Sequence, residues 1–254
     1  MTAPDVVYVV RANDRNEELR YSLRSLRNLP HGKVWIAGYC PTWVKDVGVI
    51  PVKGGHGHRS AKANLKAACL EPGVSESFMY FNDDFFVMQP HDSLPVMHRG
   101  PLADVIKAKT MVNAYVRASR TTMEILQARG IETPLMYDLH APMTVTKSGM
   151  LEALSLSHDP MIQERSLFGN LNEVGGERRR NYKHGRTDKG LGKWPFLSSN
   201  DNTFRSTPLG EYIRRQFPEP SPYENPAPPK AARTEPRRPV RYHSVGSRLR
   251  PVTA

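Results

Sequence analysis

Two adjacent carboxylates, Asp83 and Asp84, interrupt a run of apolar residues. Segment 78–87 reads Phe-Met-Tyr-Phe-Asn-Asp-Asp-Phe-Phe-Val, so an aromatic-rich strand ends in an acidic pair. Side chains alternate between the two faces of a strand, which allows one carboxylate to face a cleft while its neighbour supports it. Adjacent acids beside buried aromatic residues are costly unless a partner, such as a divalent cation, compensates them. Hard cations prefer carboxylate oxygen, so the pair are candidate metal ligands, with Asn82 as an orienting neighbour.

The same residues also suit an ordinary turn after a core strand, because Asn and Asp side chains hydrogen-bond nearby backbone groups. Both interpretations stay open on this segment alone. Asn200 and Asp201 repeat the pattern after another apolar segment, so Asp201 is a second candidate metal ligand and Asn200 a candidate substrate-binding residue. His140 is the best general base by residue type, because the pKa of imidazole lies near neutrality. Its neighbour Asp138 is a candidate for holding its tautomer, whereas a structural or surface role is the alternative for a lone histidine.

Polar and cationic side chains that suit phosphate occur at three other places. Arg20 and Arg24 lie four residues apart and share one helix face, where the alternative to substrate contact is surface ion pairing. Segment 178–186 is rich in Arg and Lys and could close over phosphates or remain a solvated loop. The glycine-rich segment 54–59 carries two histidines and precedes a helix with Asn64, a further candidate substrate-binding residue. This segment lacks the Lys-Ser/Thr of a P-loop, so a phosphate cradle, a metal pair and a plain turn all stay open.

The elements that must position these residues alternate between strand and helix. The pattern predicts strands at 5–10, 33–38, 47–52 and 78–87, and helices at 16–29 and 60–70. This order favours an α/β fold with a mostly parallel sheet and flanking helices. Ligands of such sheets bind beyond the carboxyl ends of the strands, so Asn13, Asp14 and the acidic pair are expected on one rim. Further along, we expect helical structure at 102–129, 149–156 and 209–217, a strand at 194–200 and a long surface loop at 168–193.

Charge is unevenly distributed along the chain. The 254 residues include 36 Lys+Arg and 25 Asp+Glu, a net charge of +11. Residues 225–254 carry seven Arg or Lys against Glu235, which is 7 − 1 = +6 and leaves +5 for residues 1–224. We expect a catalytic domain at 1–224 and a disordered Pro/Arg-rich tail at 225–254, which has too few large apolar residues to fold. The tail has no aromatic platform, so we expect no specific nucleic-acid binding, only non-specific contact with a phosphate backbone.

Cysteine use and hydropathy bear on the compartment. The two cysteines, Cys40 and Cys69, have no metal-ligand spacing and imply no disulfide framework. No apolar segment approaches the length of a membrane span, and the N-terminus lacks the basic-then-apolar pattern of a signal peptide. We therefore expect a soluble, cytoplasmic protein.

Four segments of the chain fall into a recognisable order. They are 5–8 with 16–26, then 72–84 ending in Tyr-Phe-Asn-Asp-Asp, then Leu-His-Ala-Pro at 139–142, and 196–201 continuing to 217–224. In this order they resemble the four conserved regions of the Stealth family. That family includes bacterial capsule phosphotransferases and the animal N-acetylglucosamine-1-phosphotransferase. The matches span nearly all of the expected globular part.

The resemblance implies a nucleotide-binding core of the GT-A or Rossmann-like type, assisted by Mg²⁺ or Mn²⁺. It implies transfer of a sugar-1-phosphate from a nucleotide-sugar donor to a hydroxyl of a carbohydrate acceptor. His140, Asp84 and Arg20 would be catalytic, and Arg24 would contact the donor. The family's first motif usually continues Trp-Val-Asp/Asn-Gly, whereas this chain reads Val-Val-Arg-Ala-Asn-Asp at 9–14.

That departure leaves the donor sugar and the broken bond open. Attack at phosphorus gives phosphotransfer, and attack at the anomeric carbon gives glycosyl transfer with release of a nucleoside diphosphate. A third possibility is a non-catalytic fold that binds nucleic acid or protein.

Overall fold

A computed structural model describes residues 3–13, 15–52, 58–159, 161–184 and 190–226. Residues 1–224 form one compact unit. The predicted disordered tail lies almost entirely outside the described residues, so its disorder stays a prediction. The fold described below is that of residues 1–224.

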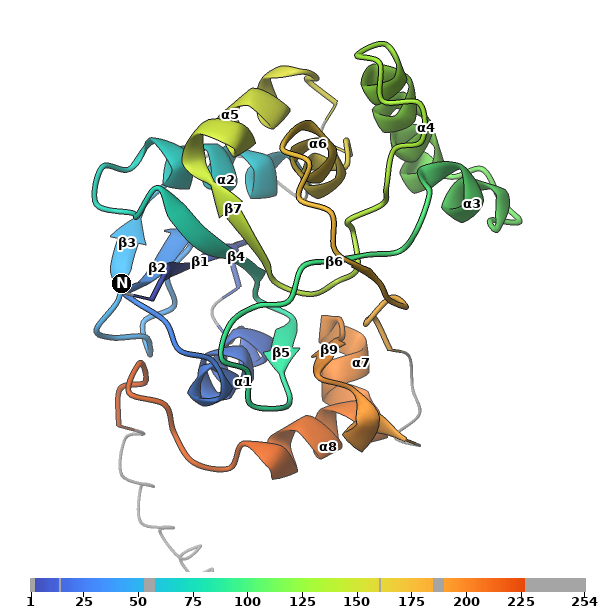
Figure 1. Ribbon diagram of the computed structural model, residues 1–254. Coiled ribbons are helices and arrows are strands. Elements are labelled where there is room, and N and C mark those ends of the chain that lie inside the picture. Colours follow the sequence, from blue (N-terminus) through green and yellow to red (C-terminus); the bar gives the residue numbers. More distant parts are fainter. Residues whose placement is uncertain (1–2, 14, 53–57, 160, 185–189, 227–254) are drawn as a thin grey trace, which may run out of the picture. The chain divides into compact units, whose positions relative to one another are not determined.

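A five-stranded sheet forms the centre of this unit (Figure 1). Its strands are β1 (Asp5–Val10), β2 (Val34–Gly38), β3 (Gly48–Ile50), β4 (Ser77–Asn82) and β7 (Met143–Thr146), in the order β3-β2-β1-β4-β7. The first four are parallel and β7 is antiparallel to β4. The predicted α/β fold with a mostly parallel sheet is therefore confirmed.

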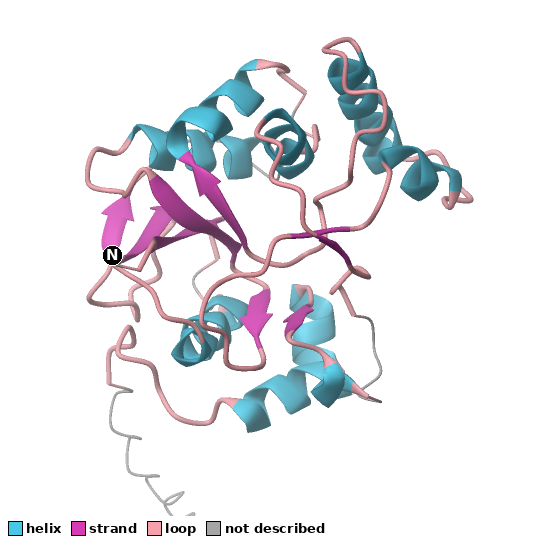
Figure 2. Ribbon diagram, in the orientation of Figure 1, coloured by secondary structure: helices cyan, strands magenta, loops and turns pink. Residues whose placement is uncertain are grey.

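Helices cover both faces of the central sheet (Figure 2). One face packs on α2 (His58–Leu70), α5 (Lys147–Ser155) and α6 (Glu164–Leu171), and the other on α1 (Glu17–Ser25) with the 3-10 turn η1 (Leu26–Asn28). Strand β1 shows why: Val7 and Val9 enter the first core, while Val6, Tyr8 and Val10 enter the second. A strand that is apolar from Val6 to Val10 thus supplies two cores, because successive side chains point to opposite faces.

The segment predicted as one strand at 78–87 is divided between two sheets. Strand β4 ends at Asn82, and β5 (Phe85–Val87) pairs antiparallel with β9 (Phe196–Ser198). Asp83 and Asp84 form the turn between them. A third core below this small sheet joins Phe86 to α7 (Asp201–Ser206) and α8 (Pro208–Gln216). The acidic pair therefore lies where the chain leaves the central sheet, in the turn that one of the two interpretations of this segment predicted.

The remaining elements are β6 (Met97–His98), α3 (Leu102–Lys107), α4 (Ala114–Gln127), β8 (Glu177–Arg178) and the 3-10 turn η2 (Leu191–Lys193). The prediction of a surface loop at 168–193 is wrong for residues 168–171, which are helical. Helix α6 runs to Leu171, and Leu167 and Phe168 are buried in the first core. Among the described residues, every helix is too short or too polar to traverse a bilayer.

Candidate active site

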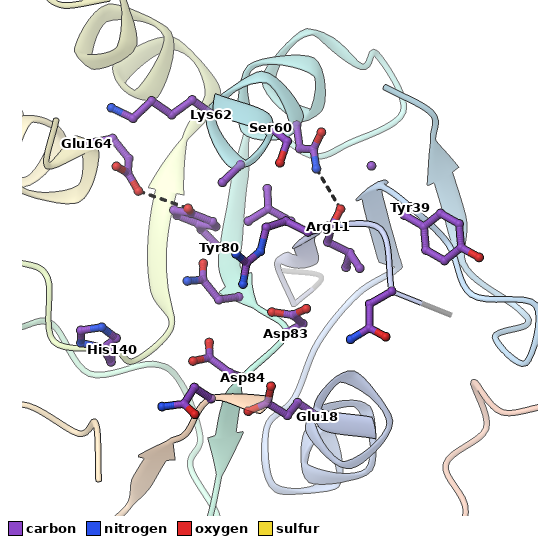
Figure 3. A pocket seen from close by; sticks show the side chains of 18 of the residues that line it. Arg11, Glu18, Tyr39, Ser60, Lys62, Tyr80, Asp83, Asp84, His140 and Glu164 are labelled. Carbon is purple, nitrogen blue, oxygen red and sulfur yellow. Dashed lines mark hydrogen bonds between the residues drawn. The ribbon is translucent and has the colours of Figure 1, made fainter. Parts of the chain in front are cut away.

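A cleft of about 1270 Å³ opens at the carboxyl ends of β1, β2 and β4 (Figure 3). Residues 161–165, which lead into α6, and His140 also line this cleft. Ten of the residues singled out from the sequence line it: Asn13, Asn64, Asn82, Asp83, Asp84, Asp138, His140, Lys183, Asn200 and Asp201. Arg20 and Arg24 do not line it.

The acidic pair forms the floor of this cleft. Asp83 accepts a hydrogen bond of 2.9 Å from Asn16 Nδ2, and Asp84 accepts one of 3.0 Å from Ser198 Oγ. Lys183 Nζ lies 3.6 Å from Asp84 Oδ2. Burial, and next the charge of Asp84, raise the pKa of Asp83 to about 6. Proximity of the two carboxylates therefore costs free energy that a bound cation would offset.

The donor set fits a hard divalent cation. Two carboxylates at one turn are the protein contribution that Mg²⁺ commonly receives, with water and phosphate oxygens completing the shell. In the described part of the chain, no group of three or more His, Cys, Asp or Glu side chains is arranged to hold a metal. A cation held by Asp83 and Asp84 would thus keep most of its positions for ligand oxygens.

A third carboxylate, Glu18, was not predicted from the sequence. It lies on α1, lines the cleft and is only 6% exposed. Burial, and next the charge of Asp84, raise the pKa of Glu18 to about 8, while the Ser199 hydroxyl donates to it. The sequence signal was ambiguous, because Glu17 and Glu18 together read as the usual acidic first turn of a helix. The structure separates them, with Glu17 outside the cleft, 3.7 Å from Arg214.

The raised pKa of Glu18 predicts how stability depends on pH. The folded state keeps a proton that the unfolded state releases near the ordinary pKa of 4.5, so the free energy of unfolding should fall as pH rises from 4.5 to about 8 and level off above that. Glu18→Gln keeps an oxygen for Ser199 but cannot ionise. It should raise the melting temperature at pH 9 by several degrees relative to wild type, with less effect at pH 6.

Melting curves of both proteins between pH 6 and 9 test this, and the difference between them isolates Glu18 because Asp83, whose pKa is about 6, titrates in both. Glu17→Gln is the matched control, since Glu17 lies on the same turn, outside the cleft and half-exposed. Parallel curves for wild type and Glu18→Gln would show that Glu18 is ionised in the folded protein.

Asn16 connects helix α1 to the acidic pair. It caps the helix, because its Oδ1 accepts from Leu19 N at 3.1 Å while its Nδ2 donates to Asp83. Its φ of 21° is one that asparagine tolerates better than most residues. The cap therefore sets both the start of α1 and the orientation of Asp83.

His140 is held by a residue other than the one expected. Its Nδ1 lies 3.0 Å from Asn181 Oδ1, which also accepts from Lys183 N at 3.1 Å. A backbone N–H only donates, so the Asn181 atom is the oxygen and His140 Nδ1 carries a hydrogen. The other ring nitrogen, Nε2, then bears the lone pair of a neutral imidazole. Asp138 contacts the Tyr115 hydroxyl instead.

Arg165 is the main cationic residue that sequence reasoning missed. It is 5% exposed, lines the cleft and donates from Nη2 to Asn82 Oδ1 at 3.1 Å. Its guanidinium stacks over Tyr80, 3.8 Å from the ring centroid, and its buried Nε has no hydrogen-bond partner among the described residues. A buried guanidinium with unused donors is suited to an anion. A single arginine beside an apolar stretch gave no motif from which to infer this role.

The remaining predicted residues shape the rim. Asn64 Nδ2 donates to Val10 O at 2.9 Å, and Asn200 caps α7 by accepting from Thr203 N at 3.0 Å. Asp201 is exposed, with Asn13 Nδ2 at 3.5 Å and Arg205 at 3.8 Å, so it lies beside the floor rather than in it.

Two predicted phosphate-binding segments are only partly described. Residues 53–57 lie outside the described part of the chain, so the glycine-rich phosphate cradle stays a prediction. Asp14 also lies outside it, and its place on the rim stays a prediction too. In segment 178–186, Lys183 lines the cleft, whereas Arg178, Arg179 and Arg180 are exposed away from it. Arg186 is not among the described residues.

Arg20 and Arg24 point to the other side of α1. Arg24 Nε and Arg20 Nη1 lie 2.7 and 2.9 Å from Glu224, whose side chain is 2% exposed. Arg20 also covers the Trp43 ring at 4.2 Å. These arginines fasten segment 217–224 to the helix that carries Glu18 and Asn16, and their expected contacts to the donor stay a prediction. Burial opposes ionisation of Glu224, but hydrogen bonds from Arg24 and Ser221 and the two positive charges hold its pKa below the usual value.

Removing the acid of this clamp should destabilise the fold. Glu224→Gln leaves two partly buried guanidinium groups without a counter-charge, and we expect a loss of about 3 kcal/mol in the free energy of unfolding. Urea denaturation at pH 7 measures it, with the exposed Glu211→Gln as control. A loss below about 0.5 kcal/mol would mean that the clamp is no stronger than a surface ion pair.

Comparison with known proteins gives one distant similarity. No protein-family model matches the chain. The chain is 25% identical over 158 residues, 54% of its length, to the exopolysaccharide phosphotransferase CpsY of Mycobacterium leprae (strain TN). The aligned region covers 29% of that protein, so the chain matches less than a third of the length of this curated relative.

Proposed function

We propose that this protein is a sugar-phosphate transferase that moves a sugar-1-phosphate from a nucleotide sugar to a carbohydrate hydroxyl. The observation that carries the proposal is that the acidic pair Asp83–Asp84 shares one cleft with His140 and Arg165. The similarity to an exopolysaccharide phosphotransferase supports a sugar-phosphate transferase in general terms, and agrees with the resemblance to the Stealth family. The dependence on a nucleotide sugar and on a metal is our own inference.

Asp83 and Asp84 are the residues that would hold Mg²⁺ or Mn²⁺. When bound, the cation would neutralise part of the charge on the donor diphosphate. Arg165, at the start of α6, supplies a fixed positive charge in the same cleft, where its stacking on Tyr80 and its bond to Asn82 restrict its motion. Phosphoryl transfer depends mainly on positioning and charge stabilisation, which these groups provide without covalent chemistry.

His140 provides the base for the acceptor. Its Nε2 takes the proton of the acceptor hydroxyl as the hydroxyl oxygen bonds to the phosphorus next to the sugar. The bond from that phosphorus to the bridging oxygen breaks, and a nucleoside monophosphate leaves with the electron pair. Asn181 accepts from Nδ1–H throughout and so favours the imidazolium that forms.

The identity of the released nucleotide tests this proposal. The protein is incubated with a panel of nucleotide sugars and oligosaccharide acceptors, with Mg²⁺ or Mn²⁺, and the nucleotide products are separated by chromatography. A nucleoside monophosphate supports phosphotransfer. A nucleoside diphosphate would replace our proposal with glycosyl transfer at the same cleft, and no metal-dependent turnover of any donor would overturn the enzyme assignment.

A further inference from the structure

A second pocket, of about 370 Å³, adjoins His140. We call it the side pocket; it shares Tyr115, His140 and Lys183 with the main cleft. Its full lining is Arg99, Lys109, Asn113, Tyr115, His140, Asn181 and Lys183. Three of these seven residues, Arg99, Lys109 and Lys183, are cationic, and none of the seven carries a carboxylate. The side pocket therefore differs from the floor of the main cleft, where carboxylates gather.

The two asparagines turn hydrogen-bond donors toward the side pocket. Asn113 caps α4, so its Oδ1 is occupied by Val116 N at 3.0 Å. The Oδ1 of Asn181 is occupied by His140 Nδ1 and Lys183 N. Neither amide nitrogen donates to any other described residue, so each has N–H groups to offer. The lining thus has spare donors and few spare acceptors, which is the hydrogen-bonding character of an anion site.

The cations of the side pocket are incompletely neutralised. Asp84 lies 3.6 Å from Lys183, and Asp138 contacts the Tyr115 hydroxyl. Within the described ranges, neither Arg99 nor Lys109 forms an ion pair. Arg99 donates to the Tyr115 hydroxyl at 3.2 Å, and the Lys109 ammonium lies 5.6 Å from the centroid of the same ring. Tyr115 therefore gathers, at one end of the cleft, two positive charges that form no ion pair with any described residue.

We propose that the side pocket binds an anionic group of the acceptor, close to the hydroxyl that His140 deprotonates. The inference rests on the proposed function and adds the acceptor class: an acidic glycan rather than a neutral one. A phosphodiester and a uronic-acid carboxylate both present oxyanion acceptors to such donors. In an acceptor made by repeated transfer, the phosphodiester would come from the previous turnover, whereas the carboxylate would belong to the sugar itself.

The test compares three acceptors that differ only in charge. They are a neutral disaccharide, its phosphodiester-linked counterpart and its uronic-acid counterpart, each used at a saturating concentration of the donor that gives turnover. The variants are Arg99→Gln and Lys109→Gln. Lys107→Gln is the matched control, because Lys107 is exposed at the end of α3 and does not line the side pocket. The readout is the ratio of kcat/KM for each anionic acceptor to kcat/KM for the neutral acceptor.

We expect wild type to prefer one anionic acceptor by at least about tenfold, and the preference to fall about tenfold in each variant at the side pocket but not in Lys107→Gln. The acceptor that shows the preference identifies its source as phosphodiester or carboxylate. Equal use of neutral and anionic acceptors would overturn the side-pocket inference and leave the proposed function standing.

A second readout does not depend on turnover. The phosphodiester and uronic-acid disaccharides are titrated into the protein and followed by ligand-observed NMR at two salt concentrations. Binding that weakens in Lys109→Gln but not in Lys107→Gln supports the side pocket even if no donor is turned over, in which case only the proposed function fails. Absence of binding, or equal binding in both variants, overturns the inference.

Discussion

Replacing Asp83 or Asp84 by asparagine is expected to reduce metal-dependent donor turnover by at least about a thousandfold. Each substitution removes a negative charge from the turn that would hold the cation, and the loss of metal-assisted charge stabilisation corresponds to several kcal/mol in the barrier. Stability should not fall, because asparagine keeps the shape of the turn. For Asp83→Asn it should rise, since the raised pKa of this acid shows that its ionised form is disfavoured in the fold.

Two controls make that result specific. Asp92→Asn changes an exposed acid outside the cleft and should leave turnover unchanged. Asp201→Asn changes a residue that was predicted to be a metal ligand but that is exposed and next to Arg205, so we expect a loss of no more than about tenfold. Rates are measured at saturating Mg²⁺ and over a metal titration. Full activity in both Asp83→Asn and Asp84→Asn would remove the enzyme assignment from this cleft.

Replacing His140 by alanine is expected to lower kcat by about 10²–10⁴-fold, the usual contribution of a positioned general base. The backbone at His140 has a φ of 53°, a conformation that non-glycine residues adopt infrequently and that often occurs at functional positions. The donor KM should change little, because the imidazole acts on the acceptor. Kinetic constants for donor and acceptor, measured separately, check both expectations.

Asn181 gives a matched variant for the same residue. Asn181→Leu removes the acceptor that holds His140 Nδ1–H but leaves the imidazole in place. We expect a smaller loss in kcat than in His140→Ala, since the imidazole stays in the cleft and loses only the partner that orients it. If His140→Ala retained wild-type kcat, the base would have to be sought elsewhere in the cleft, with Glu18 as the next acid on its floor.

Local patterns in the sequence predicted much of this fold. The nearly all-apolar β1, the helical spacing in α1 and the strand-helix alternation of the first ninety residues reflect short-range rules, so the parallel sheet and its rim followed from them. The acidic pair was predictable for the same reason, since its position after β4 fixes it at the carboxyl edge.

Residues whose roles depend on long-range packing were not predictable. Arg165 reaches the cleft because α6 packs on the sheet, and nothing near residue 165 in the sequence indicates that contact. The role of Arg20 and Arg24 depends on Glu224, some 200 residues away, so their shared helix face suggested a binding surface where the structure has a clamp. The sequence suggested Asp138 as the partner of His140 because it is close in sequence, but the side chain that contacts His140 Nδ1 is Asn181, 41 residues further along the chain.

The central claim is that Asp83 and Asp84 hold a cation against a diphosphate. The most direct measurement is a titration of Mn²⁺ followed by electron paramagnetic resonance, with and without the nucleotide sugar that gives turnover. We predict that the wild-type protein binds Mn²⁺ more tightly when the nucleotide sugar is present, and that Asp83→Asn and Asp84→Asn abolish this gain while Asp92→Asn keeps it. The same gain in all three variants, or none in wild type, would contradict the account.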